Sequence, residues 1–337
     1  MSTEGSATLN PIFDLYRSKS SLIERTRAAV LTEVRRTSTG LAATAEEVLV
    51  KKLRSDLPPL GEMLPWVLGE LSGVSPAALN RLARGWLAIY LYGHLLDERA
   101  DRNERLTSEE QLLCWILFQF GLHNLHSVTH GTPFEAGFER YLSSAVKYQM
   151  QDLSDRGQRH SSRRARYSSG KNNCLVACAA AVAATRRANP RVVEFTLRLV
   201  PGLQHLDDIA DLTEDAQQGN YTELLGRALG GRVADLAECD ELEIIDAAVR
   251  SGALETILAA AEKALVAARK ALGAKQWQAI RETPSGMFFD RLDGCVRFVR
   301  HDVESIRREL LDAPSPAREQ RLIRSVRQKV KLVAQGS

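Results

Sequence analysis

Four aspartates lie close together near the middle of the chain, and their spacing suits metal binding. They are Asp207, Asp208, Asp211 and Asp215. In a helix, Asp208, Asp211 and Asp215 share one face, with Asp207 beside it. Like charges at this spacing destabilise a helix by roughly 0.2–0.5 kcal/mol per pair. The pattern therefore predicts that a positive group neutralises these carboxylates.

A second acidic segment lies upstream. Asp97 and Asp101 are one helical turn apart and follow the apolar, aromatic run from Trp86 to Tyr92. Carboxylate oxygens are ligands that Mg²⁺ prefers, and bound Mg²⁺ usually keeps further positions for substrate phosphates. The sequence therefore predicts two acidic helix ends that face each other across an apolar cavity and hold a diphosphate.

Basic residues between the two acidic segments could supply further positive charge. Lys171 is the best candidate, because it lies at the start of an apolar helix, where free backbone amides and the helix dipole favour an anion. The arginine run before it is either a solvated surface or part of the same diphosphate site. Its candidate residues are Arg163, Arg164 and Arg166.

Composition indicates a globular chain. Of the 337 residues, 44% are hydrophobic and 26% charged, and the net charge of +3 gives no reason to expect a nucleic-acid partner. The N-terminus lacks a signal-peptide layout, and no apolar run is long enough to span a bilayer. We expect a cytoplasmic protein without stable membrane insertion. Its cysteines lack C-x-x-C spacing and are predicted to be thiols: Cys114, Cys174, Cys178, Cys239 and Cys295.

Apolar residues recur at helical spacing from Ser20 onward, and no segment alternates like a strand. This predicts an all-α fold with residues 1–18 as a flexible leader and residues 19–337 as one helical domain. The predicted helices are roughly 20–37, 41–55, 60–72, 76–101, 107–129, 134–155, 162–187, 190–218, 221–229, 241–250, 252–273, 276–311 and 315–333.

Pro201 and Gly202 lie one turn before the aspartates, inside a predicted helix. Proline removes a backbone hydrogen bond and kinks or restarts a helix. Two interpretations stay open: the pair is an incidental boundary, or it aims Asp207 and Asp208 into the cavity.

The histidines and tryptophans are predicted to be mainly structural. No zinc-like grouping is evident among His94, His123, His126, His205 and His301. The tryptophans are expected in the core, where one or two could line the cavity and stabilise a cation. They are Trp66, Trp86, Trp115 and Trp277.

The pattern that begins at Gln204 and ends at Asp215 resembles the second aspartate-rich motif of trans-polyprenyl diphosphate synthases and of the wider class I isoprenoid synthase superfamily. Its tail, from Asp211 to Gly219, is also similar to squalene and phytoene synthases. Asp97, Glu98 and Asp101 resemble the first motif, and Lys171 falls about where the family keeps a diphosphate-binding lysine. The resemblance covers roughly residues 58 to 220.

The resemblance implies an α-helical bundle around a deep apolar cavity, in which three Mg²⁺ ions hold a prenyl diphosphate. Its implied metal ligands are Asp97, Asp101, Asp207, Asp208, Asp211 and Asp215. Gln204 and the basic residues named above are implied to bind the diphosphate. Tyr92 and Gly93 occupy positions that in chain-elongating members gauge the depth of the hydrocarbon tail. A homodimer is a further expectation from the family.

Two departures from the family concern the second substrate. Chain-elongating members grip isopentenyl diphosphate with a basic segment, but here Glu62 and Met63 stand where lysine and arginine would be. The family's Arg-Arg-Gly after the first motif is also absent. These differences favour a terpene cyclase that uses one C15 or C20 prenyl diphosphate. The Asn-Asp-x-x-Ser-x-x-x-Glu motif usual in bacterial terpene synthases is absent as well.

Two alternatives remain open at this stage. The first is prenyl transfer by the same fold, either head-to-head, to a non-isopentenyl acceptor such as an indole, or as a polyprenyl diphosphate synthase. The second is a non-catalytic subunit that regulates a partner synthase. Retention of the costly clustered carboxylates argues against the second alternative.

Overall fold

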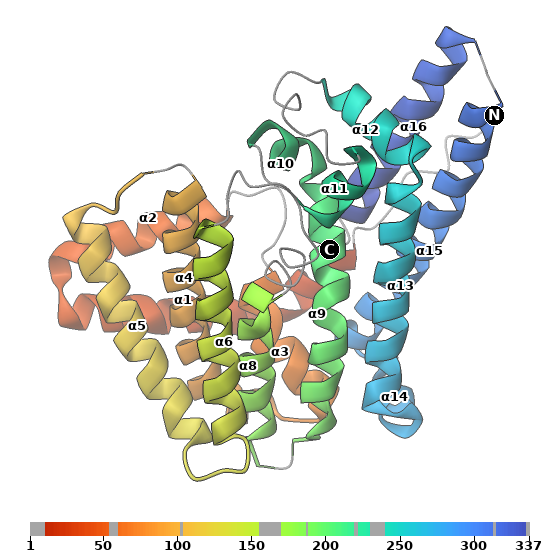
Figure 1. The fold of residues 1–337 in the computed structure, drawn as a ribbon. Helices are drawn as coiled ribbons and strands as arrows, with labels where there is room; N and C mark the ends of the chain where they lie inside the picture. The colour runs from red at the N-terminus through yellow and green to blue at the C-terminus, as the bar shows by residue number, and fades with distance from the viewer. Residues whose placement is uncertain are drawn as a thin grey trace. The chain divides into compact units, whose positions relative to one another are not determined.

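A computed structural model describes residues 11–53, 60–101, 104–154, 170–186, 188–218, 222–229, 240–312 and 315–334. Within these ranges the chain forms helices joined by turns and contains no strand, which confirms the predicted all-α class (Figure 1). The chain divides into two compact units. The predicted single domain and deep apolar cavity stay predictions. No described helix has the length and hydrophobicity needed to cross a membrane.

The first unit comprises Met1–Tyr141, Leu175–Glu194 and Ala274–Met287. Its helices are α1 (Pro11–Thr37), α2 (Ala42–Leu53), α3 (Leu60–Ser72), α4 (Pro76–Asp101), α5 (Ser108–Thr129) and α14 (Ala274–Ile280), with a short 3-10 helix at Thr39–Leu41 and parts of α6 (Glu135–Ser154) and α8 (Asn173–Ala183). Helix α4 packs against α1, α3 and α5. Leu87, Leu91 and Leu95 on one face of α4 join Leu113 and Leu117 of α5 in the core.

The first helix begins earlier than predicted. Helix α1 starts at Pro11, so residues 11–18 are helical and the predicted leader was too long at its C-terminal end. Ile12 and Leu15 are buried in the core, which explains why this segment is ordered as a helix. Residues 1–10 lie outside the described residues.

A buried ion pair connects α1 to α3. Arg27 pairs with Glu62, and both side chains are almost fully buried. Glu24, which is largely exposed, pairs with the same guanidinium at 2.9 Å. Met63, the next residue along α3, is completely buried. The two positions that differ from the family's basic segment therefore belong to the core of this unit.

The second unit comprises Leu142–Cys174, Phe195–Gly273 and Phe288–Ser337. It contains most of α9 (Arg191–Ala210) and α15 (Pro284–Leu311), together with α10 (Leu212–Gln218), α11 (Glu223–Leu229), α12 (Glu241–Arg250), α13 (Ala253–Leu272) and α16 (Pro316–Ala334). Helix α12 packs against α11, α13 and α16. The predicted helix 276–311 is divided into α14 and α15, because Pro284 begins a new helix.

Ion pairs join α13 to α15 in this unit. Glu262 of α13 pairs with Arg297 at 3.2 Å and with Arg300 at 2.9 Å. Arg269 pairs with Asp290 at 3.1 Å.

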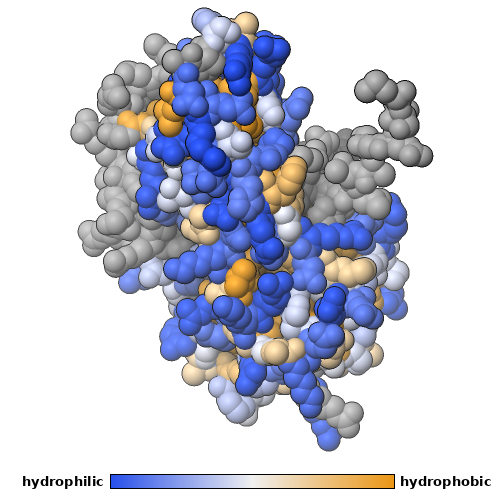
Figure 2. Space-filling view, turned by 90° about the vertical axis from the view of Figure 1, so that its right-hand side faces the viewer, coloured by the Kyte–Doolittle hydropathy of each residue, from blue (hydrophilic) through white to orange (hydrophobic). Residues whose placement is uncertain are grey.

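Figure 2 shows a face covered mostly by hydrophilic side chains, with separate hydrophobic patches among them.

The tryptophans only partly follow the prediction. Trp66 and Trp86 are buried, and the indole of Trp86 donates a hydrogen bond to the carbonyl of Gly61 at 2.6 Å. Trp277 is half-buried. Trp115 is 64% exposed, so its prediction as a core residue is wrong. The four cysteines in the described part of the chain are free thiols, as predicted, and Cys239 lies outside it.

Candidate functional site

The aspartates of the second acidic segment lie at the end of α9 and the start of α10. Asp207 and Asp208 belong to the last turn of α9, Asp211 forms the junction, and Asp215 lies in α10. Backbone hydrogen bonds of the helical type run from the Asp211 amide to the Asp207 carbonyl at 2.9 Å and from Asp215 to Asp211 at 2.8 Å. The backbone therefore stays nearly helical through the junction, and the aspartates keep the spacing that the sequence predicted.

These carboxylates differ in exposure. Asp208 is only 3% exposed, Asp215 is half-buried, and Asp207 and Asp211 are exposed. Leu206, Ile209 and Leu212 are buried beside them and anchor this segment in the second unit. One edge of the cluster is thus fixed in the interior while the other meets solvent.

A chain of hydrogen bonds fixes the buried carboxylate. The side-chain amide of Asn172 donates to Gln204 Oε1 at 2.7 Å, and Gln204 Nε2 donates to Asp208 Oδ1 at 2.7 Å. Both ends of the Gln204 amide are thereby used. Gln204 therefore positions Asp208 in this structure, and its role in binding the diphosphate, expected from the resemblance, stays a prediction. No local sequence pattern predicts this role for Asn172.

The pKa values of two aspartates are strongly raised. Burial raises the pKa of Asp208 to about 7. The hydrogen bond from Gln204 opposes this rise, and the charge of Asp207 adds to it. Loss of hydration, with the charges of Asp207 and Glu214, raises the pKa of Asp211 to about 6. Both values indicate carboxylates whose negative charges are incompletely compensated.

Lys171 acts on the same carboxylates. Its positive charge lowers the pKa values of both Asp208 and Asp211, which places the ammonium group near the cluster. Lys171 itself is half-buried just before α8. The structure therefore brings the predicted lysine and the predicted aspartates together within the second unit.

Helix α11 borders the cluster on another side. The charge of Glu223 raises the pKa of Asp208, and Glu223 pairs with Arg227 at 2.8 Å. His205 is mostly desolvated, which lowers the pKa of its imidazole. We infer that His205 is neutral at pH 7 and adds no positive charge to the site.

The first acidic segment lies at the C-terminal end of α4, in the first unit. Asp97 is half-buried there, and Asp101 is the last residue of the helix, with a side chain outside the described part. Arg99 pairs with Glu104 and with Glu110 of α5. Since residues two apart point to opposite sides of a helix, this pairing directs Asp97 away from the α5 terminus.

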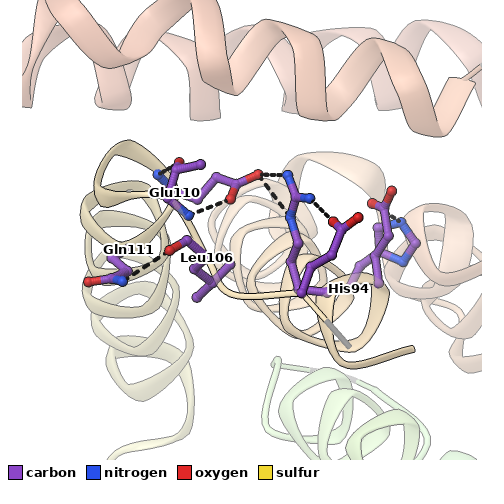
Figure 3. Close-up of polar contacts among 8 residues, drawn as sticks. His94, Leu106, Glu110 and Gln111 are labelled. Carbon is purple, nitrogen blue, oxygen red and sulfur yellow. Dashed lines mark hydrogen bonds and ion pairs between the residues drawn. The ribbon is translucent and has the colours of Figure 1, made fainter. Parts of the chain in front are cut away.

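The start of α5 is itself well defined. Thr107 and Glu110 form a capping box, in which each side chain accepts a hydrogen bond from the other's backbone amide. Gln111 donates to the carbonyl of Leu106 at 3.1 Å. Figure 3 shows these contacts together with His94 on α4. The end of α4 is thereby tied to a fixed helix terminus, which limits the orientations open to Asp97.

Tyr92 and Gly93 lie one turn before Asp97. The ring of Tyr92 packs against Phe118 of α5 with centroids 5.1 Å apart, and burial raises the pKa of its hydroxyl. Gly93 is exposed, with open space where a side chain would begin. Tyr92 therefore contributes to packing between α4 and α5. A role for either residue in gauging a hydrocarbon tail stays a prediction.

Three predicted diphosphate ligands lie outside the described residues: Arg163, Arg164 and Arg166. The two acidic segments belong to different units, so their predicted face-to-face arrangement also stays a prediction.

The donor set at the end of α9 suits a hard cation chemically. It offers carboxylate oxygens, the ligands that Mg²⁺ prefers. Two of these carboxylates have raised pKa values that a bound cation would lower. Their oxygens do not gather as three ligand atoms within 4.8 Å of one another. Among the described residues, that arrangement occurs at His126, His130 and Glu135. The expectation that no histidine belongs to a metal-like grouping is therefore wrong for His126.

In comparisons with known proteins, no family model and no curated protein matched this chain. The resemblance to isoprenoid synthases consequently depends on the motif residues alone.

Proposed function

We propose that this chain is a Mg²⁺-dependent class I terpene synthase. It ionises a linear prenyl diphosphate, farnesyl or geranylgeranyl diphosphate, and converts the allylic cation to a terpene. The observation that supports this most strongly is the cluster of Asp207, Asp208 and Asp211 at the end of α9, with Lys171 close enough to lower the pKa values of two of them.

Asp207, Asp208 and Asp211 have distinct roles in this proposal, together with Gln204 and Lys171. The exposed Asp207 and Asp211 bind the cation from the solvent side, and the buried Asp208 binds it from the interior. Gln204, held by Asn172, keeps the Asp208 carboxylate in one orientation. Lys171 contacts the diphosphate directly, since among the described residues its positive charge acts on both carboxylates. Bound Mg²⁺ would supply the positive charge that stabilises the departing diphosphate.

The surroundings of Glu62 and Met63 favour cyclisation over chain elongation. A grip for isopentenyl diphosphate needs basic side chains directed at a substrate. In this chain Glu62 instead pairs with the buried Arg27, and Met63 fills the core. Both side chains stabilise the first unit and neither offers a positive charge to an acceptor. We therefore propose that one prenyl diphosphate is the sole isoprenoid substrate.

Incubation of the purified chain with farnesyl or geranylgeranyl diphosphate and Mg²⁺ tests the proposal. The expected products are diphosphate and a hydrocarbon or alcohol with the carbon number of the substrate, identified by mass spectrometry. Adding isopentenyl diphosphate should leave the product unchanged. The variant Asp208→Asn should lose activity by about 10²–10³-fold, since it removes a charge used in ionisation. Glu194→Gln makes the same chemical change at an exposed position of α9 and should retain activity.

Other products would identify the alternatives. A longer diphosphate formed with isopentenyl diphosphate would contradict the proposal and indicate a polyprenyl diphosphate synthase. A product with twice the substrate's carbon skeleton would indicate head-to-head transfer. Absence of any product, together with no effect of Mg²⁺ and pyrophosphate on the melting temperature, would indicate a non-catalytic subunit.

A further inference from the structure

Two histidines and a glutamate meet where α5 ends and α6 begins. His126 lies in the last turn of α5, His130 is its C-terminal cap, and Glu135 opens α6. Glu135 Oε1 is 2.7 Å from His130 Nδ1 and 3.5 Å from His126 Nε2. The two imidazole rings are nearly parallel, with centroids 5.0 Å apart. Three potential ligand atoms thus converge from two helices.

The separations are close to those around a tetrahedral zinc ion. Ligand atoms about 2.0–2.1 Å from such an ion are about 3.3–3.4 Å from one another. The distance of 3.5 Å between His126 and Glu135 already matches this, and the distance of 2.7 Å between His130 and Glu135 requires only a small side-chain movement. Both histidines are exposed, so solvent can reach the point between the three atoms and supply a fourth ligand.

The carboxylate is held in place by a group outside the ligand set. Glu135 Oε2 accepts a hydrogen bond from the backbone amide of Gly131 at 2.8 Å. Gly131 adopts a left-handed conformation (φ of 71°) that favours glycine, so the turn sequence supports this contact. This hydrogen bond fixes the orientation of the carboxylate, as neighbouring groups commonly do for metal ligands.

We propose that His126, His130 and Glu135 form a binding site for a divalent transition metal of the zinc class. Two imidazole nitrogens with one carboxylate oxygen suit Zn²⁺, Co²⁺ or Ni²⁺, whereas Mg²⁺ prefers six oxygen ligands. The site lies in the first unit, does not include the aspartates of α9, and stands independently of the proposed function. A bound ion would join the last turn of α5 to the first turn of α6 and stabilise this corner.

Calorimetric titration of the chelator-treated full chain with ZnCl₂, in buffer that contains excess Mg²⁺, tests the proposal. We expect about one equivalent of Zn²⁺ to bind and the melting temperature to rise. Replacing both histidines with glutamine should weaken binding at least tenfold. Because both side chains are exposed, the double variant should keep the far-ultraviolet circular dichroism of the wild type. His123→Gln changes another exposed histidine of α5 and should bind Zn²⁺ like the wild type.

Three results would overturn the proposal. The first is no Zn²⁺ binding by the wild-type chain. The second is unchanged affinity in the double variant. The third is loss of binding in Asp208→Asn with retention in the double variant, which would place the ion at the aspartates. A tetrahedral Co²⁺ absorption spectrum in the wild type, absent from the double variant, would support the ligand set directly.

Discussion

Asp208 is costly to ionise in the described structure. Its carboxylate is buried, it accepts one hydrogen bond from Gln204, and Asp207 and Glu223 add negative charge nearby. Lys171 compensates this only in part, since the pKa still rises to about 7. A protein keeps such a group most readily where a ligand restores the charge balance. The residue thus connects the stability of the metal-free chain to its proposed chemistry.

The pH dependence of stability should reveal this cost. Because the folded-state pKa of Asp208 lies above its ordinary value of 3.8, the folded state binds the proton more tightly. The resulting stability is fully present below pH 3.8 and is lost as the pH rises through about 7. Asparagine has no charge to bury, and its side-chain oxygen can still accept the hydrogen bond from Gln204. Asp208→Asn should therefore gain stability relative to the wild type between pH 5 and pH 8.

Urea denaturation without Mg²⁺ at pH 5, 6, 7 and 8 measures this gain. The rise of the Asp208 pKa from 3.8 to about 7 sets an upper limit of about 4 kcal/mol on the difference. Glu194→Gln should follow the pH dependence of the wild type. A constant difference between Asp208→Asn and the wild type at all four pH values would contradict the raised pKa.

Residue types and spacing were enough to predict part of the site. The helical repeat places Asp207, Asp208 and Asp211 near one another, because this contact is local along the chain. Asn172 could not be found in this way, since it lies 32 residues before its partner Gln204. The pair His126 and His130 carries a local signal, two histidines one helical turn apart, but Glu135 comes from the next helix.

At the scale of elements, α9 is held against α13 by a close approach at Gly202. A side-chain carbon at this position would lie 2.9 Å from Ala264 Cβ and 3.4 Å from the Ala261 carbonyl oxygen. Pro201, on the exposed side, lies inside α9 without ending it. Of the two interpretations, the incidental boundary is therefore wrong, and the aim of Asp207 and Asp208 into a cavity stays a prediction. The neighbouring Gly202 matters more than Pro201, because Gly202 sets how closely α9 packs against α13.

Gly202→Ala should test this packing. Alanine normally favours a helix over glycine by up to about 1 kcal/mol. Here the added carbon forces α9 and α13 apart, and overpacking of this kind costs about 1–3 kcal/mol. Gly294→Ala, at an exposed position of α15 with open space around it, should be neutral or stabilising. Chemical denaturation of both variants at one pH gives the comparison, and stabilisation by Gly202→Ala would refute the close approach.

The connection between α1 and α3 gives a second test at this scale. Glu62→Lys introduces the residue type expected in chain-elongating isoprenoid synthases but places a second cation beside the buried Arg27. Breaking a buried pair in this way costs about 3–5 kcal/mol. Glu24→Gln removes an exposed partner of the same arginine and should cost no more than about 1 kcal/mol. Equal stability of the two variants, measured by denaturation, would show that Glu62 has no structural role.

Helix boundaries were predicted best where local side chains define them. Helix α5 begins within one residue of its predicted start, because the capping box of Thr107 and Glu110 is a local feature. Helix α1 was misjudged at its start, since its first turn is stabilised by tertiary burial of Ile12 and Leu15. Periodicity alone does not show which apolar residues find partners far along the chain.

At the scale of the whole molecule, the two predicted acidic segments belong to different units. Asp97 belongs to the first unit, whereas Asp208 and Lys171 belong to the second. The order of the motifs along the chain predicts that the two acidic segments bind one ligand together. Joint binding depends on the tertiary arrangement, so it is tested by measuring how each segment affects ligand affinity. A ligand that contacts both segments should lose affinity when either is altered, whereas a ligand of one segment should respond to that segment alone.

Thermal unfolding with Mg²⁺ and inorganic pyrophosphate makes this distinction. Ligand at 100 times its dissociation constant adds about 2.7 kcal/mol of stability, so the two together should raise the melting temperature by several degrees, and either alone by less. Asp97→Asn and Asp208→Asn should each abolish most of this rise, while Glu194→Gln should keep it. If Asp97→Asn retains the full rise and Asp208→Asn loses it, pyrophosphate binds at the end of α9 alone. The two acidic segments would then not form one site, because the free energy of binding would come from the second unit without help from the first.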